Sequence, residues 1–351
     1  MNDIVDSDDS TNTSEVICME NYEHYETTEK WLLGVVALPF ICIGLVANAL
    51  SVLIFSNRHM RVQRVNWYLL ILAVSDGVIL IGAFFVLTLP RLGELSRWWR
   101  LTAVGYSTSP YLYAFMALAQ TISVWMTAAM SLHRFVGVCL PFKASAILET
   151  RNVKCLIFCV ILVAVLFNTT RFFEVEVIRV CRMVPINVEL PVLRPTALRM
   201  DPLYMQVFYE WAYTLIMFVV PFAILIVVNS MVILAIHRSR QVHSKLTMDV
   251  TRKQELAKEI KTSIMLVAIV LAFFFCNTLG FVVNIMEKLE LYDLYVTFVP
   301  WSNFFVMTNA SINFSIYCMF SDRYRQLFRY YLQFISCNKR DENFQIILSN
   351  F

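Results

Sequence analysis

The chain has 351 residues, of which 58% are hydrophobic and only 16% are charged, whereas ordinary soluble domains carry about 25% charged residues. A soluble domain of this length would need an unusual core to bury so much apolar side chain, whereas a lipid bilayer accepts apolar surface directly. The formal net charge is only +3, and we expect no nucleic acid among the partners.

Residues 1–30 are predicted to form an acidic tail outside the membrane. They lack the basic start and the short apolar core of a cleaved signal peptide, so we expect the first apolar run to act as an uncleaved anchor. Asn12-Thr13-Ser14 matches the acceptor pattern for N-glycosylation. The sequence therefore predicts that Asn12 is glycosylated.

The next part of the chain is dominated by long apolar runs. Six runs without Asp, Glu, Lys or Arg cover residues 31–57, 101–132, 155–170, 211–236, 262–286 and 294–321, and a seventh run, 65–90, holds the single charge of Asp76. About 20 apolar residues cross the hydrocarbon core as a helix. The run 155–170 is short, and we expect Arg171 to extend it by snorkelling to the interface. The sequence therefore predicts an all-α membrane protein with a seven-transmembrane helix bundle over residues 31–321.

The basic residues set the orientation of this bundle. Segments 58–64, 134–154, 237–261 and 322–351 share one side of the predicted membrane and carry most of the Lys and Arg residues. By the positive-inside rule this side is cytoplasmic. We therefore expect a multi-pass protein of the plasma membrane whose N-terminus is extracellular.

Residues 322–351 are predicted to begin with a short amphipathic eighth helix on the inner membrane surface. Arginines alternate there with apolar residues that recur near a 3.6-residue period. These apolar residues are Phe320, Tyr324, Leu327, Phe328, Tyr331 and Ile335. Residues 237–261 mix charges at helical spacing, and we expect them to extend the fifth and sixth helices into the cytoplasm.

Polar residues inside the apolar runs distinguish this chain from other seven-helix proteins. The first run holds Asn48 and the second Asp76, Arg134 ends the third, Pro221 interrupts the fifth, and Asn313-Phe314-Ser315-Ile316-Tyr317 closes the seventh. A carboxylate at mid-bilayer depth is costly and indicates function. The order and spacing of these residues resemble the rhodopsin-like G-protein-coupled receptor family over nearly the whole chain.

This resemblance implies two sites that serve signalling. In the family the residue matching Asp76 binds sodium, which implies a sodium site of Asp76, Asn48, Asn313 and Tyr317, and no other cofactor. The alternative is a hydrogen-bonded knot between helices without an ion. The resemblance also implies that a heterotrimeric G protein contacts His133, Arg134, Phe135 and Pro141, with arrestin as a further partner. The alternative for Arg134 is plain interfacial snorkelling.

The chain departs from the family at several positions. His133 stands where the family has an acid, Gly280 and Phe314 stand where it has prolines, and Ser109 stands where it has a cysteine. The usual outer disulfide therefore cannot form. Because unpaired thiols are unusual in the oxidising outer compartment, we expect a bridge between Cys18 in the tail and Cys181 in the second outer loop. The alternative is that each stays unpaired or pairs between chains.

Single positions narrow the ligand. An amine receptor of this class needs an acid where Met116 stands, and a retinal protein needs a lysine where Met307 stands. The second outer loop, roughly 171–206, interleaves aromatic and acidic residues, and further acids such as Glu210 and Glu287 lie at the rim. A basic peptide with a hydrophobic end would be steered to such a mouth.

A finer resemblance points to one kind of peptide. Ala119-Gln120-Thr121, Pro141-Phe142-Lys143-Ala144 and Arg171-Phe172-Phe173-Glu174 are similar to invertebrate FMRFamide-type neuropeptide receptors. The resemblance implies a short amidated peptide ending in Arg-Phe, which requires an acid for its arginine and aromatic side chains for its ring. The acids expected to serve are Glu174, Glu176 and Glu210, and the other expected pocket residues are Gln120, Phe173, Tyr209, Trp211 and Phe281.

Other functions remain as alternatives. A chemosensory or orphan receptor would share the same fold. A transporter or channel is a weaker alternative, because transporters carry internal repeats and charges in several spans, and this chain has one deep carboxylate and no evident repeat. We expect no enzyme, since no GxSxG, HExxH or Gly-rich phosphate loop is present.

Overall fold

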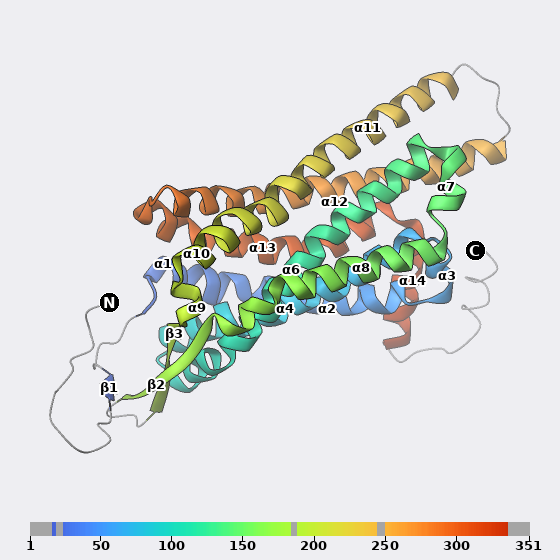
Figure 1. Cartoon of the computed structure of the whole chain (residues 1–351). Coiled ribbons are helices and arrows are strands. Elements are labelled where there is room, and N and C mark those ends of the chain that lie inside the picture. Colours follow the sequence, from blue (N-terminus) through green and yellow to red (C-terminus); the bar gives the residue numbers. More distant parts are fainter. Residues whose placement is uncertain (1–15, 19–23, 184–187, 244–249, 336–351) are drawn as a thin grey trace.

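A computed structural model describes residues 16–18, 24–183, 188–243 and 250–335. Long helices run side by side along one common direction, and a small sheet lies at one end (Figure 1). In chain order the elements are β1 (Val16–Cys18), α1 (Thr27–Glu29), η1 (Lys30–Val36), α2 (Ala37–Phe55), α3 (Arg58–Arg61), α4 (Val65–Ala83), η2 (Phe84–Thr88), α5 (Leu89–Leu95), α6 (Trp99–Cys139), α7 (Pro141–Ile147), α8 (Thr150–Asn168), η3 (Thr169–Phe173), β2 (Val175–Met183), β3 (Val188–Pro195), α9 (Ala197–Met200), α10 (Pro202–Tyr204), η4 (Met205–Tyr213), η5 (Leu215–Val219), α11 (Val220–His243), α12 (Val250–Lys288), α13 (Tyr292–Phe320) and α14 (Asp322–Ile335).

The predicted spans are confirmed as helices. Six continuous helical segments are long and apolar enough to cross a membrane, namely Thr27–Phe55, Val65–Leu95, Trp99–Cys139, Thr150–Phe173, Pro202–Arg238 and Ile260–Lys288. The seventh predicted span corresponds to α13, which packs along α12, α2 and α4. The predicted extensions of the fifth and sixth helices are also helical over their described residues, as parts of α11 and α12.

Prolines are accommodated by local changes of helix geometry. Pro221 is the second residue of α11, which follows the π-helical stretch η5, and a wider turn tolerates the missing backbone N–H of proline. Pro110 and Pro300 lie inside α6 and α13 without ending either helix. The helices therefore continue through positions where proline alone would predict a break.

Three buried apolar clusters hold the bundle together. The largest includes Tyr68 of α4 and Met130 of α6, and the others join α2 to α4 and α13, and α6 to η5 and α12. Glycine is required where α2 meets α13, because a Cβ added at Gly44 would lie 2.4 Å from Oγ of Ser311. The helices approach closely there, next to the polar core described below.

The helix α14 confirms the predicted eighth helix. Tyr324 and Leu327 are buried in the largest apolar cluster, and Oη of Tyr324 lies 2.7 Å from Oγ of Ser51 in α2. Arg329 on the other face is exposed. The apolar face of α14 therefore packs against the end of the bundle.

The second outer loop contains a sheet that the sequence analysis did not predict. Strands β2 and β3 pair antiparallel, and β1 from the N-terminal tail pairs parallel to β2. The signal was the valine-rich alternation of Val175-Glu176-Val177, which is typical of a half-buried strand. The hairpin projects from the end of the bundle at which α9 and α10 lie (Figure 1).

Candidate functional site

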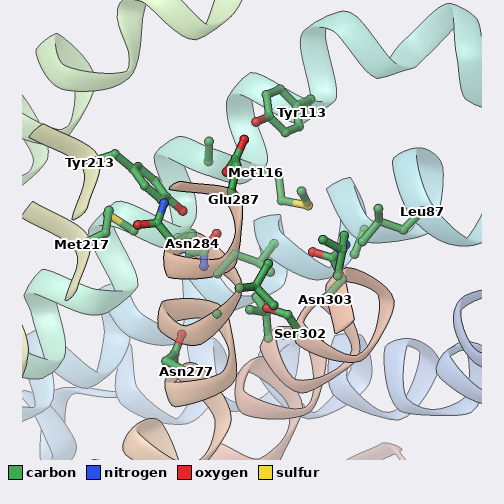
Figure 2. Close-up of a pocket in the computed structure, with 18 of the residues that line it drawn as sticks. Leu87, Tyr113, Met116, Tyr213, Met217, Asn277, Asn284, Glu287, Ser302 and Asn303 are labelled. Carbon is green, nitrogen blue, oxygen red and sulfur yellow. The ribbon is translucent and has the colours of Figure 1, made fainter. Parts of the chain in front are cut away.

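A cavity of about 230 Å³ lies between α4, α6, η4, α12 and α13, toward the hairpin end of the bundle (Figure 2). Its wall mixes apolar, aromatic and amide side chains with three charged ones. The polar and charged lining residues are Tyr113, Gln120, Arg171, Arg199, Tyr209, Tyr213, Asn277, Asn284, Glu287, Tyr295, Ser302 and Asn303. Concave sites of this mixed character are typical of ligand pockets.

One face of α12 supplies much of the polar wall. Asn277, Gly280, Asn284 and Glu287 are spaced at i, i+3, i+7 and i+10, which places them on one side of a helix. Figure 2 shows Asn277, Asn284 and Glu287 in succession along this face. Sequence reasoning missed the two asparagines, although this spacing inside an apolar run was the signal that could have found them.

Arg171 does not snorkel to the interface, so that prediction is wrong. Its side chain is 3% exposed, and Nη1 donates to Oη of Tyr113 at 3.0 Å and to Oη of Tyr209. The guanidinium also lies 3.6 Å from the carboxylate of Glu174 and 5.1 Å from the ring centre of Tyr213. A buried charge is tolerated when it is paired and hydrogen-bonded, and residues from other helices supply those partners.

Glu174 is occupied by the same network. Tyr204 donates to its Oε1 at 2.6 Å, and Tyr209 donates to its Oε2. The residue is 1% exposed and does not line the cavity. The carboxylate of Glu174 therefore already binds Arg171 and two tyrosines, and its role toward a ligand arginine stays a prediction.

The other predicted pocket residues divide into two groups. Gln120 and Tyr209 line the cavity, and Glu210 lines an adjoining cavity of about 310 Å³ that shares Tyr209, Asn284, Glu287 and Tyr295 with the first. The residues found outside both cavities are Phe173, Glu176 and Trp211, which are exposed, and Phe281, whose ring packs on Phe218 and Phe222. For these four the structure gives no place in the pocket wall.

Of the three residues predicted to join Asp76 in the polar core, Asn313 bonds directly to its carboxylate. Asp76 is fully buried, and its two oxygens accept hydrogen bonds from Ser123 at 2.9 Å and Asn313 at 2.7 Å. The amide of Asn48 donates instead to the backbone oxygens of Gly44 at 3.0 Å and Ala310 at 2.8 Å. Ser123 was missed by sequence reasoning, because a serine in an apolar run carries no signal by itself.

Two polar atoms of this core lack a partner among the described residues. They are Oδ1 of Asn313 and Oη of Tyr317, both buried. Asp76 likewise has no ion pair to a described basic side chain. Buried groups of this kind are normally satisfied, so the donor set fits a small cation or ordered water beside the carboxylate.

At the other end of α6 lie the residues predicted to contact a G protein. Both ring nitrogens of His133 are buried without a hydrogen-bond partner in the described structure, and the ring packs edge-on against Tyr68 at 5.5 Å. Arg134 and Phe135 follow at the end of the same helix, and Pro141 begins the short helix α7. Phe142 on α7 is 100% exposed, so this end of the bundle presents a bare aromatic side chain.

A salt bridge joins two helices at this same end. Nζ of Lys261 in α12 lies 2.6 Å from Oδ2 of Asp322, the first residue of α14. The hydrogen bond from Lys261 lowers the pKa of Asp322 below its ordinary value. The pair therefore stays ionised at neutral pH and connects the sixth helix to α14.

At the hairpin end, ion pairs fasten the start of the first helix to α5. Lys30 pairs with Glu94 at 3.2 Å, and Glu29 pairs with Arg91, which also lies 4.1 Å from the ring centre of Tyr25. Burial lowers the pKa of His24, so its ring is neutral at pH 7. These contacts attach the start of the first transmembrane helix to α5. The usual outer disulfide would need a cysteine at Ser109, whose hydroxyl instead donates to the backbone oxygen of Gly105.

The strand register places the two outer cysteines near each other. Val16 pairs with Cys181 and Cys18 pairs with Met183, so the cysteines lie on adjacent strands, two residues out of register. Strand spacing and rise put their α carbons about 8 Å apart, whereas a disulfide needs about 7 Å or less. A shift of two residues along β2 would place them directly opposite each other. Asn12 lies outside the described residues.

Comparisons with known proteins agree with this arrangement. Residues 47–317 match the family model of the 7 transmembrane receptor (rhodopsin family). The chain is 31% identical over 329 residues to the probable G-protein coupled receptor frpr-1 of Caenorhabditis elegans, covering 89% of this chain and 81% of that protein. It is 28% identical to the FMRFamide receptor of Drosophila melanogaster, covering 86% of this chain and 53% of that protein. It is 29% identical to the FMRFamide peptide receptor frpr-18 of C. elegans, covering 84% and 68%.

Proposed function

This chain belongs to the rhodopsin family of seven-transmembrane receptors, and from that premise we propose that it is a G-protein-coupled receptor for a short amidated peptide ending in Arg-Phe. It is a multi-pass membrane protein and a receptor, not an enzyme. The observation that carries the proposal is the cavity at the hairpin end, which is lined by one carboxylate, several amides and four tyrosines among the described residues.

The chemistry of this wall suits the end of such a peptide. Glu287 offers a charge for an arginine, tyrosine rings offer surface for a phenylalanine and a cation, and the amides of Gln120 and Asn303 can exchange hydrogen bonds with a terminal carboxamide. The adjoining cavity that holds Glu210 gives the rest of the peptide a path to the outside. Two relatives named as FMRFamide receptors support the same ligand class.

The orientation follows from the charges. We place the hairpin end outside the cell and the Arg134 end inside, in the plasma membrane, because the basic segments gather at the Arg134 end. The tail that carries Asn12 is then extracellular and open to glycosylation. A heterotrimeric G protein, and arrestin in its turn, would bind the inner end at Arg134 and the bare ring of Phe142.

A peptide screen with a G-protein readout tests the proposal. Cells expressing the receptor should respond to Phe-Met-Arg-Phe-amide at low concentration, and the same peptide with a free carboxylate should be much weaker. Untransfected cells are the control, and surface labelling verifies delivery of the receptor. A response to small organic compounds alone would favour the chemosensory alternative and contradict the peptide assignment.

The salt bridge between α12 and α14 predicts a restraint on basal signalling. Lys261→Gln should raise agonist-independent nucleotide exchange, because the inner end of α12 loses its charged partner on α14. The pair is about half exposed, and such bridges are worth less than about 1 kcal/mol, so the rise should stay within roughly fivefold. Basal exchange in membranes with purified G protein measures it.

Lys261→Arg is the matched control. It should keep basal exchange near the wild-type level, because a cation still faces Asp322 and the bridge of Asp322 to Arg325 is untouched. Equal basal exchange in the wild type and in Lys261→Gln would show that the bridge restrains nothing.

We propose a disulfide between Cys18 and Cys181, which lie on the adjacent strands β1 and β2. Mass spectrometry of unreduced peptides from the mature receptor should find the two linked, because β1 pairs directly with the strand that holds Cys181. Cys42, which is exposed on α2, should stay unlinked and serves as the control. Alkylation of Cys18 or Cys181 in intact, unreduced cells would count against the bridge.

A further inference from the structure

We propose that Glu287 is the residue that binds the arginine of the ligand, and that the charges of the cavity fix the direction in which the peptide enters. This inference rests on the proposed function and deepens it. It assigns a specific contact to a residue that sequence reasoning had counted only among the rim acids.

The cavity wall carries charges of both signs. Among the described residues that line the cavity, Glu287 supplies the one carboxylate, while Arg171 and Arg199 supply two cations. Arg199 stacks on the ring of Tyr209 at 3.5 Å, and Arg171 lies over the same ring at 4.4 Å. The two cations therefore share one wall. Arg171 is paired with Glu174, so repulsion of a ligand arginine from this wall comes from Arg199.

The carboxylate of Glu287 is available to a ligand. Glu287 is exposed, and no hydrogen bond or ion pair of its side chain with another described residue is recorded. Glu174 already accepts from two tyrosines and pairs with Arg171. Glu176 lies outside both cavities, and Glu210 lines only the adjoining one. A ligand cation that enters this cavity therefore meets one open acid.

Aromatic side chains share the cavity with this acid. The rings of Tyr213 and Tyr295 line the same cavity as Glu287. A guanidinium can bind a carboxylate with two parallel hydrogen bonds and stack on an aromatic face at the same time. Arginine fits this combination better than lysine does, because the lysine ammonium is not planar and cannot form two parallel hydrogen bonds while it stacks on a ring.

The direction of entry follows from the position of Glu287 on its helix. It lies one residue before the end of α12, whereas Asn277 lies ten residues deeper, about 15 Å along the helix axis. An arginine held at Glu287 stays near the mouth and leaves the following residue to point inward. The terminal phenylalanine and its carboxamide would then occupy the deep half of the cavity, among Met116, Gln120 and Met307.

Paired variants of receptor and peptide test the contact. The two peptides are Phe-Met-Arg-Phe-amide and its analogue with citrulline, a neutral isostere, in place of arginine. In the wild type the citrulline peptide should be weaker by about 10- to 100-fold, the usual cost of losing a charged hydrogen bond. Glu287→Gln should lower the potency of the arginine peptide by a similar factor and leave the citrulline peptide nearly unchanged.

The controls separate this contact from general damage. Glu210→Gln, with the same chemical change in the adjoining cavity, should keep the wild-type preference for arginine, and surface labelling corrects for expression. Equal loss for both peptides in Glu287→Gln, no loss for either, or selective loss in Glu210→Gln would each overturn the assignment. If the wild type responds to neither peptide, the proposed function itself fails, which these other outcomes leave intact.

Discussion

Arg134→Ala should leave the receptor at the cell surface and nearly abolish agonist-stimulated nucleotide exchange on the G protein. Arg134 is a cationic side chain near the end of α6 that we propose to be cytoplasmic, and Phe142 on the following helix α7 is fully exposed. Hydrogen bonds of charged groups are worth about 1.5–3 kcal/mol, so exchange should fall by roughly 10- to 150-fold. Exchange measured in membranes with purified G protein gives the number.

Arg151→Ala is the matched control for this variant. Arg151 is exposed on α8 at the same inner end of the bundle, so its loss removes the same charge from the same face without touching α6. We expect near-normal exchange for it. Normal exchange in Arg134→Ala, or an equal loss in both variants, would contradict a specific role for Arg134.

Asp76→Asn should remove the sodium dependence of agonist affinity. We propose that a sodium ion binds beside Asp76, with Ser123 and the unpartnered Oδ1 of Asn313 as further oxygen ligands. The amide removes the charge that would attract the ion. Couplings between two sites usually change affinity by about 5- to 150-fold. For the wild type we expect sodium buffer to lower agonist affinity, relative to choline buffer, by a factor near the lower end of this range.

Asp322→Asn serves as the control for Asp76→Asn. It neutralises a carboxylate outside the polar core, and its agonist affinity should keep the wild-type response to sodium. Peptide binding in sodium and choline buffers measures both variants. If sodium weakens agonist binding equally in the wild type and in Asp76→Asn, then Asp76 is not the ion ligand, and the hydrogen-bonded knot explains the polar core.

The sequence predicted the helices well because each long apolar run permits few other structures in lipid. The same holds for α14, where regular spacing placed Tyr324 and Leu327 on the packed face. The hairpin β2–β3 was missed, since its valine alternation is short and lies in a region expected to be a loop. Local patterns therefore fixed the elements that lipid constrains and left the outer ones open.

The pocket was harder to predict, because its chemistry depends on residues far apart in the chain. Arg171 ends an apolar run, where either snorkelling or burial satisfies the charge, and only the fold brings Tyr113 and Tyr209 to it. Once Arg171 is buried, Glu174 becomes its partner. The sequence alone could not tell which acid lines the cavity, and among the described lining residues the carboxylate is that of Glu287.

Photo-crosslinking tests whether an amidated Arg-Phe peptide binds inside this cavity. The probe is Phe-Met-Arg-Phe-amide with benzoylphenylalanine as its last residue, a group that reacts readily with methionine. Met116, Met217 and Met307 all line the cavity, so mass spectrometry should find the adduct on one of them, and excess unlabelled peptide should prevent it. Adducts confined to residues outside the cavity, such as Phe173 or Trp211, or adducts that unlabelled peptide does not displace, would contradict the account.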